Sequence, residues 1–428
     1  MIADTIDHTA NYPSTQTIHR EVLPNGIVVL VYERFASPSF VIEGSVQTGA
    51  LAETRTTAGL ANFTAVSLLH GTQNYSFEQI YDELESAGAD LNFSGGFHTT
   101  GFSAQGLIED FDLVLDLTAA ALRTPTFPPD QIQQIRGQLI TSLHMRANDT
   151  RSMASLAFDE LVYGGHPYGR SELGYLDTIP HITPDHLQQF HQLNYGPQNM
   201  IITVVGAIKA ETAVAKIQQT LGDWHNLQQP SPILVADMPR PATLLKSHVA
   251  MPDKQQADIR LGLPGPRRAE PDYLQASLMN TILGVFGMMG RIGQSVREEQ
   301  GLAYYAYSRL QGGLGPAPWC AIAGVAPTAV EQATTSILDE IKRMQDEIVP
   351  EDELADNKAY RTGSLPMSLE TNSGIADVIS DMELYGLGLD YLVDYPEQIE
   401  AITAVQIQQA AQKYLSTKQI GVAVAGPE

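Results

Sequence analysis

Strand-like and helix-like patterns of apolar residues follow one another along the first half of the chain. β-Branched runs bounded by turn residues predict strands at residues 26–31 and 39–46. Ser76 and Gln79 have the spacing of a capping box, and they predict a helix that ends before Gly88. The first half therefore begins with strands and continues with a helix.

Two further helices are predicted where prolines precede a helical pattern. Pro128 and Pro129 come directly before a long pattern that contains Ser142, and Thr183 with Pro184 opens the last helix of this half. Strand runs followed by helix runs, twice over, are typical of an α+β sandwich in each half, with a mostly antiparallel sheet packed against helices.

The chain also resembles itself. Residues 182–206 and 402–426 align without a gap at a constant offset of 220. Each copy is a Thr-capped amphipathic helix followed by a β-branched strand that ends in Gly. The repeat indicates an ancient duplication and hence two homologous domains.

A proline-rich stretch lies between the two copies. Four prolines within twelve residues that lack clear periodicity are typical of a linker: Pro230, Pro232, Pro239 and Pro241. We therefore expect an N-terminal domain at 1–225, a linker at 226–245 and a C-terminal domain at 246–428. Both domains then have an ordinary size.

The composition is that of a soluble globular protein, since 43% of the 428 residues are hydrophobic and one is Cys. Twenty-five Lys and Arg against 49 Asp and Glu give a formal net charge of −24. This balance argues against nucleic acid or an anionic membrane as a partner, because both select basic surfaces. Acidic charge would attract basic peptides, although it also serves solubility alone.

The targeting signals that would place the chain elsewhere are absent from the sequence. The N-terminus has no basic region followed by an apolar run, and it is too acidic for a transit peptide. No stretch reaches the roughly 18 uninterrupted apolar residues of a membrane helix. We expect a cytoplasmic location.

Residues 59–72, Gly-Leu-Ala-Asn-Phe-Thr-Ala-Val-Ser-Leu-Leu-His-Gly-Thr, carry the main chemical signal. They resemble the segment with the inverted zinc motif His-x-x-Glu-His in the M16 metallopeptidases, the pitrilysin or insulinase family that includes mitochondrial processing peptidase. The resemblance puts Asn62 at the first His ligand, Ala65 at the catalytic Glu and Val66 at the second His. The helix at 135–149 resembles the one with the third ligand, a Glu, whose place Ser142 takes.

These substitutions remove the chemistry of the motif. Catalytic zinc needs about three N, O or S donors and an open position for water. The Val66 side chain offers no donor, and Ala65 offers no carboxylate to accept a proton from water. We therefore expect no catalytic residue and no metal in this chain.

No other zinc pattern replaces the lost one. The only cluster among the eleven His is His181, His186 and His191, whose five-residue steps turn about 140° on a helix and do not stack as ligands would. We interpret these His as solvated or capping. Cys320 is the only Cys, so neither a Cys-rich zinc site nor an internal disulfide can form.

Other segments support the resemblance over residues 15–425. Residues 23–26, 161–170 and 195–200 look like recurrent phrases of the family, and they occur in the expected order. The strand expected at 90–100 looks like the one to which family enzymes add an extended peptide. The resemblance implies two homologous α+β domains of the M16 and LuxS type that enclose a chamber.

The second half keeps a possible substrate-contacting pair. Residues 288–308 resemble the C-domain segment in which an Arg and a Tyr, seven residues apart, contact substrate beside the zinc, and Arg297 and Tyr304 have this spacing. The alternative is that Arg297 pairs with Glu298 or another surface carboxylate and that Tyr304 is a core residue. Tyr305 competes for the Tyr role, because strand alternation would point it the other way.

Taken together, the resemblance implies the non-catalytic subunit of a heterodimeric M16 zinc metalloendopeptidase. Zinc is then expected in the partner, which bears the intact motif, while Arg297 and Tyr304 bind the peptide substrate in trans and this chain closes the peptide chamber. The alternatives are an inert structural or assembly protein and a peptide-binding homodimer of the same fold. A metal-independent hydrolase is disfavoured, since no Gly-x-Ser-x-Gly motif occurs.

Overall fold

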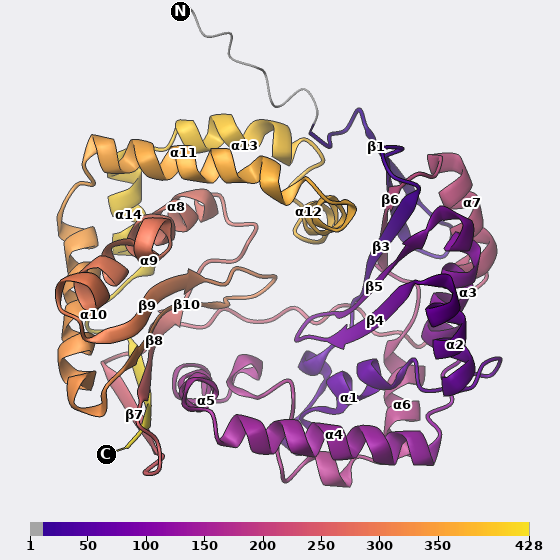
Figure 1. Ribbon diagram of the computed structural model, residues 1–428, viewed down its shortest axis with the longest axis horizontal. Coiled ribbons are helices and arrows are strands. Elements are labelled where there is room, and N and C mark those ends of the chain that lie inside the picture. Colours follow the sequence, from indigo (N-terminus) through magenta and orange to yellow (C-terminus); the bar gives the residue numbers. More distant parts are fainter. Residues whose placement is uncertain (1–11, 428) are drawn as a thin grey trace, which may run out of the picture. The chain divides into compact units, whose positions relative to one another are not determined.

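A computed structural model describes residues 12–427 of the chain (Figure 1). These residues form two compact units, each built from three separate segments. The first unit contains residues 12–141, 172–233 and 366–395, and the second contains residues 142–171, 234–365 and 396–427.

The first unit is built on a six-stranded mixed sheet with the order β1-β2-β6-β3-β5-β4. Strands β2 and β6 are parallel, and the other neighbours are antiparallel. The strands are β1 (Ile18–Val22), β2 (Val28–Glu33), β3 (Ser39–Val46), β4 (Asp90–Gly95), β5 (Thr100–Leu107) and β6 (Ile201–Gly206). All six residues of β6 are buried, so the apolar run predicted as a strand lies in the core.

Helices pack on this sheet and beyond its end. They are α1 (Leu60–Ser67), α2 (Phe77–Ala87), α3 (Phe111–Arg123), α6 (Pro184–Asn194), α7 (Ala210–Leu221) and α12 (Asn372–Leu384). The predicted capping box at Ser76 is confirmed, since the Ser76 hydroxyl accepts from the Gln79 N–H and the Gln79 side chain accepts from the Ser76 N–H.

Helix α7 corrects the expectation that the helix opened by Thr183 is the last of its half. It follows β6, and Lys209, which is not a usual capping residue, occupies its N-cap. Two of its buried positions, Ala210 and Ala213, are alanines. With Val214, Ile217 and Leu221 they follow helical spacing, so the apolar pattern was present in the sequence without a capping signal to mark its start.

The second unit repeats the strand order of the first without an equivalent of β1. Its five-stranded sheet has the order β7-β11-β8-β10-β9, with β7 and β11 parallel and the other neighbours antiparallel. The strands are β7 (Leu245–Ala250), β8 (Ala257–Pro264), β9 (Ala303–Leu310), β10 (Pro318–Val325) and β11 (Gly421–Gly426). The predicted α+β architecture of two sheets packed with helices is thus confirmed.

The helices of the second unit are α5 (Thr150–Tyr163), α8 (Tyr273–Gly284), α9 (Phe286–Gly293), the π-helical turn η7 (Gln294–Glu299), α10 (Val330–Asp346) and α14 (Ala404–Tyr414). Helices α4 (Pro129–Ala147), α11 (Glu351–Ser368) and α13 (Tyr391–Glu400) each have residues in both units. The pairs α6–β6 and α14–β11 lie at the offset of 220 that the internal repeat predicted.

Each sheet is covered by a helix from the other half of the sequence. Helix α5 packs on β7, β8 and β11, where Gly421 is so close that a Cβ would lie 2.4 Å from a methyl of Val162. Helix α12 packs on β3 and β6, where the Ser380 hydroxyl donates to Thr203 Oγ1 at 2.8 Å. Neither sheet therefore buries both faces with residues of its own half.

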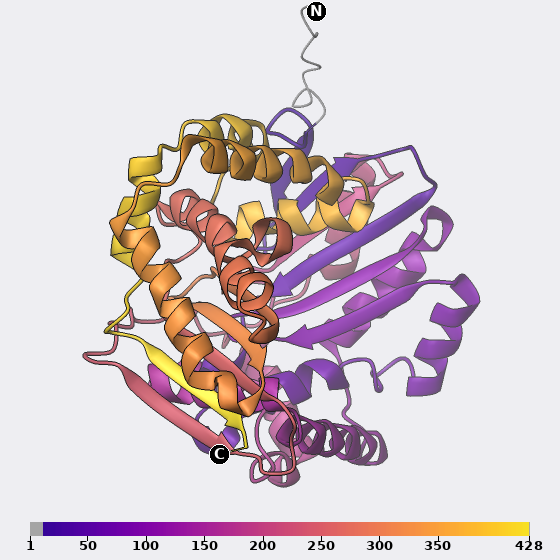
Figure 2. The same ribbon diagram turned by 60° about the vertical axis from the view of Figure 1, so that its left-hand side comes forward.

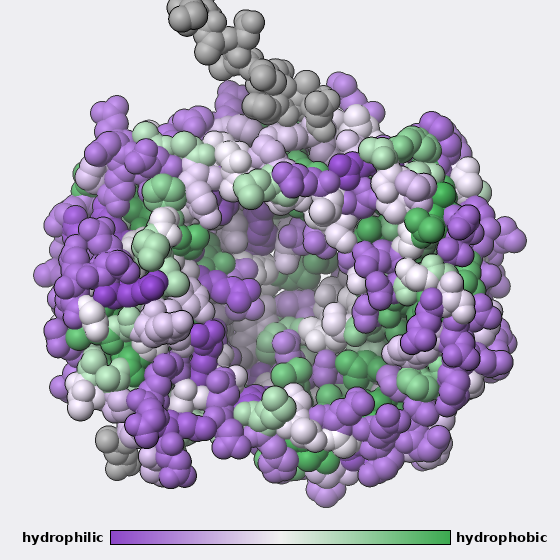
Figure 3. Space-filling model, viewed as in Figure 1, coloured by the Kyte–Doolittle hydropathy of each residue, from purple (hydrophilic) through white to green (hydrophobic). Residues whose placement is uncertain are grey.

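Figure 3 shows polar residues over most of the face in view, with apolar residues gathered in smaller patches. Over residues 12–427, no helix is long and apolar enough to cross a membrane.

Candidate functional site

Helix α1 contains three of the positions at which the sequence predicted lost zinc chemistry. The carboxylate of Glu53 caps the helix, accepting from the N–H groups of Gly59 at 3.0 Å and Ala61 at 2.5 Å. Gly59 has φ +95°, a conformation that favours Gly. The buried carboxylate closest in sequence to α1 is thus engaged by its first turn, where the helix dipole favours negative charge.

Asn62 lies against the end of strand β4. It is buried, and a Cβ on Gly95 would lie 2.6 Å from the Asn62 Cα, so this close approach requires Gly. Strand β4 is at the edge of its sheet and pairs with β5. Asn62, which the resemblance assigns to the first zinc ligand, therefore lies beside the edge strand of the sheet.

The other three positions that the resemblance assigns to the zinc motif provide no strong metal donor. Ala65 is fully buried, Val66 is partly buried, and Ser142 is exposed on the last part of α4. No group of three or more His, Cys, Asp or Glu side chains that could hold a metal ion occurs in the part of the chain that the structure describes. The donor set on α1 does not fit zinc.

The three clustered His have separate structural surroundings. His186 belongs to a capping box with Thr183, and His181 is exposed, as the interpretation of solvated or capping residues predicted. For His191 that interpretation was wrong, because this side chain is buried and its Nε2 donates to the Leu122 carbonyl at 2.9 Å. Burial lowers the pKa of His191 to about 4, so the ring is neutral near pH 7.

Arg297 lies on the π-helical turn η7, which packs against β9. Its side chain is 32% exposed, and its Nε lies 3.4 Å from Glu298 Oε1, so the ion pair considered as an alternative is present. An exposed pair of this kind contributes at most about 1 kcal/mol. Arg297 can therefore exchange this partner for another carboxylate or a carbonyl.

Tyr304 is near the start of β9, after Gly301 with φ +62° has ended the preceding turn. Its side chain is 81% exposed, so the alternative of a core residue was wrong. Strand β9 is the second edge of its sheet and pairs with β10. A phenol at this place is available to a ligand.

Tyr305 points to the other face and is 8% exposed. Its hydroxyl donates to Asp258 Oδ1 and accepts from Arg151 Nε at 2.9 Å, while the Arg151 guanidinium lies 4.2 Å from its ring centroid. The Thr150 hydroxyl donates to Asp258 Oδ2 at 2.5 Å. Burial and the bond to Asp258 raise the pKa of Tyr305. This network joins α5 to β8 and β9.

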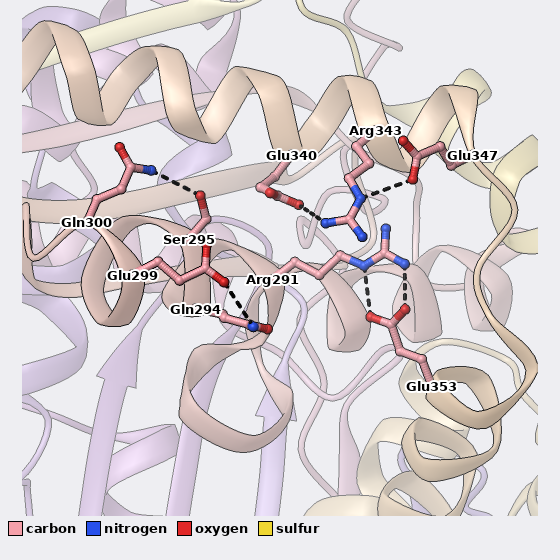
Figure 4. Close-up of polar contacts among 9 residues, drawn as sticks. All are labelled: Arg291, Gln294, Ser295, Glu299, Gln300, Glu340, Arg343, Glu347 and Glu353. Carbon is pink, nitrogen blue, oxygen red and sulfur yellow. Dashed lines mark hydrogen bonds and ion pairs between the residues drawn. The ribbon is translucent and has the colours of Figure 1, made fainter.

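An ion pair between a buried Arg and a partly exposed Glu holds the segment that precedes Arg297 (Figure 4). Arg291 is 7% exposed and binds Glu353 of α11 through two bonds, from Nε at 2.8 Å and from Nη2 at 2.5 Å. Bidentate pairs of this kind fix orientation as well as distance. This pair was not predicted from the sequence, although an Arg within a run of Gly, Met and Ile is a signal of a buried guanidinium with a partner.

Side chains on both ends of η7 fix the turn itself. Gln294 donates to Glu299 at 3.1 Å, and Gln300 donates to Ser295 at 3.2 Å (Figure 4). Burial raises the pKa of nearby Glu340 on α10, against the opposing effect of guanidinium groups. The backbone that presents Arg297 is thus held by bonds to its own turn and to α11.

Comparison with known proteins agrees with the resemblance. Residues 33–172 match the family model "Insulinase (Peptidase family M16)", and residues 181–360 match the model "Peptidase M16 inactive domain". An uncharacterized zinc protease of Streptomyces coelicolor is 24% identical over 416 residues, which cover 96% of this chain and 90% of the relative. A probable beta subunit of the mitochondrial-processing peptidase of Arabidopsis thaliana is 22% identical over 432 residues, which cover 98% and 80%.

Solved structures agree with the fold. The crystal structure of a peptidase M16 inactive domain from Pseudomonas fluorescens has a TM-score of 0.88 and 26% identity, and the match covers 96% of this chain and 98% of that one. A protease from Helicobacter pylori has a TM-score of 0.89 with 20% identity, covering 96% and 99%. With both halves matched in order and almost the full length covered, the chain belongs to the M16, or insulinase, family of peptidases.

Proposed function

We propose that this chain is the non-catalytic subunit of a two-chain M16 zinc endopeptidase and that it binds the peptide substrate for its partner. The observation that carries the proposal is a contrast between two places. Helix α1 has Asn62, Ala65 and Val66 at the positions that the resemblance assigns to the ligands and the base, whereas Tyr304 is exposed and Arg297 is held only by a weak surface pair.

Zinc, which the family implies, does not fit α1. An Asn amide is a weak neutral ligand, and Val and Ala side chains have no donor atoms. Hydrolysis then needs zinc from another subunit, which would lower the pKa of a bound water. The residues of this chain can bind and orient a peptide.

Arg297 and Tyr304 supply the donors for that task. A guanidinium and a phenol can donate to a peptide carbonyl or to the negative charge that develops on it during attack. The bidentate pair between Arg291 and Glu353 holds the backbone before Arg297, so the place from which this side chain reaches out is fixed.

The first unit, taken by itself, also offers a surface for an extended peptide. Strand β4 is an edge strand, so its outer N–H and C=O groups are available for β-addition. The net charge of −24 favours peptides that carry basic residues. Peptide binding without cleavage would use the same features, which keeps an inert peptide-binding or assembly protein as the second candidate.

Reconstitution with an M16 chain that has an intact His-x-x-Glu-His motif, encoded beside this one, tests the proposal. We expect no stoichiometric zinc and no cleavage from this chain alone, and cleavage from the mixture. Arg297→Ala and Tyr304→Phe should each lower kcat/KM of the mixture about 10- to 100-fold, the range for a hydrogen bond to a charged group. Arg309→Ala and Tyr307→Phe, on the same strand β9, are the matched controls.

Two results would contradict the proposal. Stoichiometric zinc and cleavage by this chain alone would mean that the assignment of Asn62, Val66 and Ser142 is wrong. If the partner cleaves equally well without this chain, then this chain is a structural or assembly protein and does not contribute to cleavage.

A further inference from the structure

The two sheets differ at one corner, the place where β2 lies near α3 in the first unit and β7 lies near α10 in the second. In the first unit, β2 has β1 as its outer neighbour, and α7 packs against α3 and β2. In the second unit, the equivalent strand β7 is the edge of the sheet, and over residues 12–427 no strand pairs with its outer side. Figure 2 shows β7 and β11 at the margin of their unit beside α10.

Helix α7 shows what the corner holds when it is filled. The carboxylate of Glu33 on β2 accepts from the Ala210 N–H at 3.0 Å, at the start of α7. Lys216 pairs with Asp112 of α3. Aliphatic residues of α7 itself, such as Ile217, are buried on one face of the helix. The helix is therefore held by an apolar face and by charges on either side.

The internal repeat assigns the equivalent positions of the second unit. Val29 lies opposite Ile202 of β6, and Lys246 lies opposite Val422 of β11. Because Ile202 and Val422 are equivalent at the offset of 220, Lys246 stands in the place of Val29. The next residue on this face is Val31 in β2 and His248 in β7 by the same pairing.

The helices correspond as well. Each of α3 and α10 follows a short 3₁₀ turn, and the second residue of each is acidic, Asp112 in α3 and Glu331 in α10. Asp112 is the residue that pairs with Lys216 of α7. Glu331 therefore stands where a docked helix would present a cation.

The corner of the second unit is an open groove of about 1190 Å³. Its walls come from the sheet and from α10, and they include Lys246, His248, Val422, Val424, Glu331 and Leu338. Val29 and Val31 are fully buried in the first unit, whereas their counterparts Lys246 and His248 are exposed. The groove is larger than the roughly 300–1,000 Å³ of small-molecule pockets.

The strand beside the groove also has a free hydrogen-bonding edge. The Leu245 N–H donates to the Ile420 carbonyl at 2.9 Å and the Met251 N–H to the Gly426 carbonyl at 2.8 Å, so the odd-numbered positions face β11. Because alternate residues of a strand bond to opposite sides, the backbone groups of Lys246 and His248 point away from the sheet.

We propose that this groove binds an amphipathic helix of a partner chain, in the place that α7 takes in the first unit. The helix would lay small aliphatic residues on Val422, Val424 and Leu338 and present a Lys or Arg to Glu331. This charge pattern defines the partner, and it is independent of the proposed peptidase role.

A second copy of the chain does not meet these requirements. Its own α7 is already packed on α3 and β2, so lending it would open the first unit. A net charge of −24 on each copy also opposes self-association. A different chain with an accessible helix is the occupant that the charges favour.

A peptide with the sequence of residues 207–223 is the probe, because α7 fits the equivalent corner. A cross-link between the exposed positions 212 and 219 would hold it helical, since an isolated helix of this length is marginal in water. We expect saturable binding of the fluorescently labelled peptide to the full-length chain, measured by anisotropy, and none for a scrambled peptide.

Substitutions in the groove test whether the peptide binds there. Leu338→Glu should weaken it at least about tenfold, the loss expected when a carboxylate enters an apolar contact. Asp339→Lys, on the same helix but outside the groove, should leave it unchanged. Glu331→Lys should weaken binding, and a peptide with Lys216→Glu should restore it, which keeps the test valid if Leu338→Glu fails to fold.

The proposal is overturned if the peptide does not bind, or if binding is unaffected by both groove variants. In the first case the polar residues of β7 only protect a solvated sheet edge. In the second case the peptide displaces α7 in the first unit. Since the assay contains no zinc-bearing partner and no cleavage, its failure is separate from failure of the proposed peptidase role.

Discussion

At the scale of single residues, two adjacent tyrosines have opposite surroundings. Tyr304 is exposed at the strand edge, while Tyr305 is buried between Asp258 and Arg151. Successive side chains of a strand point to opposite faces. On the face of Tyr304, Ala306 and Ser308 are buried further along β9, while Tyr304 itself is uncovered near the start of the strand. Tyr304 is therefore the candidate for substrate, and Tyr305 holds the unit together.

Conservative substitution should separate these roles. Tyr305→Phe removes the hydroxyl shared by Asp258 and Arg151, and it should lower the free energy of unfolding by about 1–3 kcal/mol, because a buried carboxylate loses a donor. Tyr304→Phe should leave the unfolding free energy unchanged. Urea titrations of both variants are the measurement, and equal losses in the two would refute the distinction.

At the scale of elements, helix α12 meets its sheet through two carboxylates. Burial, with a contribution from Asp377 on α12, raises the pKa of Glu43 on β3 to about 7. Burial also raises the pKa of Asp377. The raised pKa of Glu43 means that the folded protein binds a proton that the unfolded chain has released between about pH 4.5 and 7.

The sign of the pH dependence follows from this difference. The stabilising contribution of protonated Glu43 is complete below the pKa of the unfolded chain and is lost as pH rises through about 7. We expect the Tm to fall between pH 5 and 8 and Glu43→Gln to reduce that fall. Glu397→Gln on α13, at an exposed position, is the control. An unchanged slope in Glu43→Gln would show that other groups cause the dependence.

At the scale of the whole molecule, folding couples the two halves of the chain. The second sheet takes α5 from the first half, and the first sheet takes α12 from the second half. Without α5, the face of β7, β8 and β11 around Gly421 would expose apolar residues to water. Each half alone should therefore fold incompletely.

A chain cut within residues 222–244, which form no helix or strand, tests this coupling. We expect residues 1–235 and 236–428, produced separately, to bind a dye for apolar surface and to unfold without a cooperative transition. Produced together, they should form a cooperative complex, because α5 and α12 are then present. Cooperative unfolding of either half alone would contradict the expectation.

The sequence by itself determined the properties that are local or chemical. The side chains of Val66 and Ala65 have no metal-donor atoms in any fold, so their inability to bind zinc needed no coordinates. The capping box of Ser76 and the repeated helix and strand at 182–206 and 402–426 depend on contacts within a few residues, and local pattern predicted both.

Tertiary structure decided what depends on distant partners. The Arg291–Glu353 pair joins residues 62 positions apart, and the burial of His191 depends on Leu122, 69 positions away. Contacts with α5 and β8 bury Tyr305, whereas Tyr304 is left uncovered near the start of β9. The exchange of α5 and α12 depends on which sheet face each helix buries. Periodicity along the chain indicates which face of a helix or strand is apolar. Which other element packs on that face depends on the three-dimensional structure.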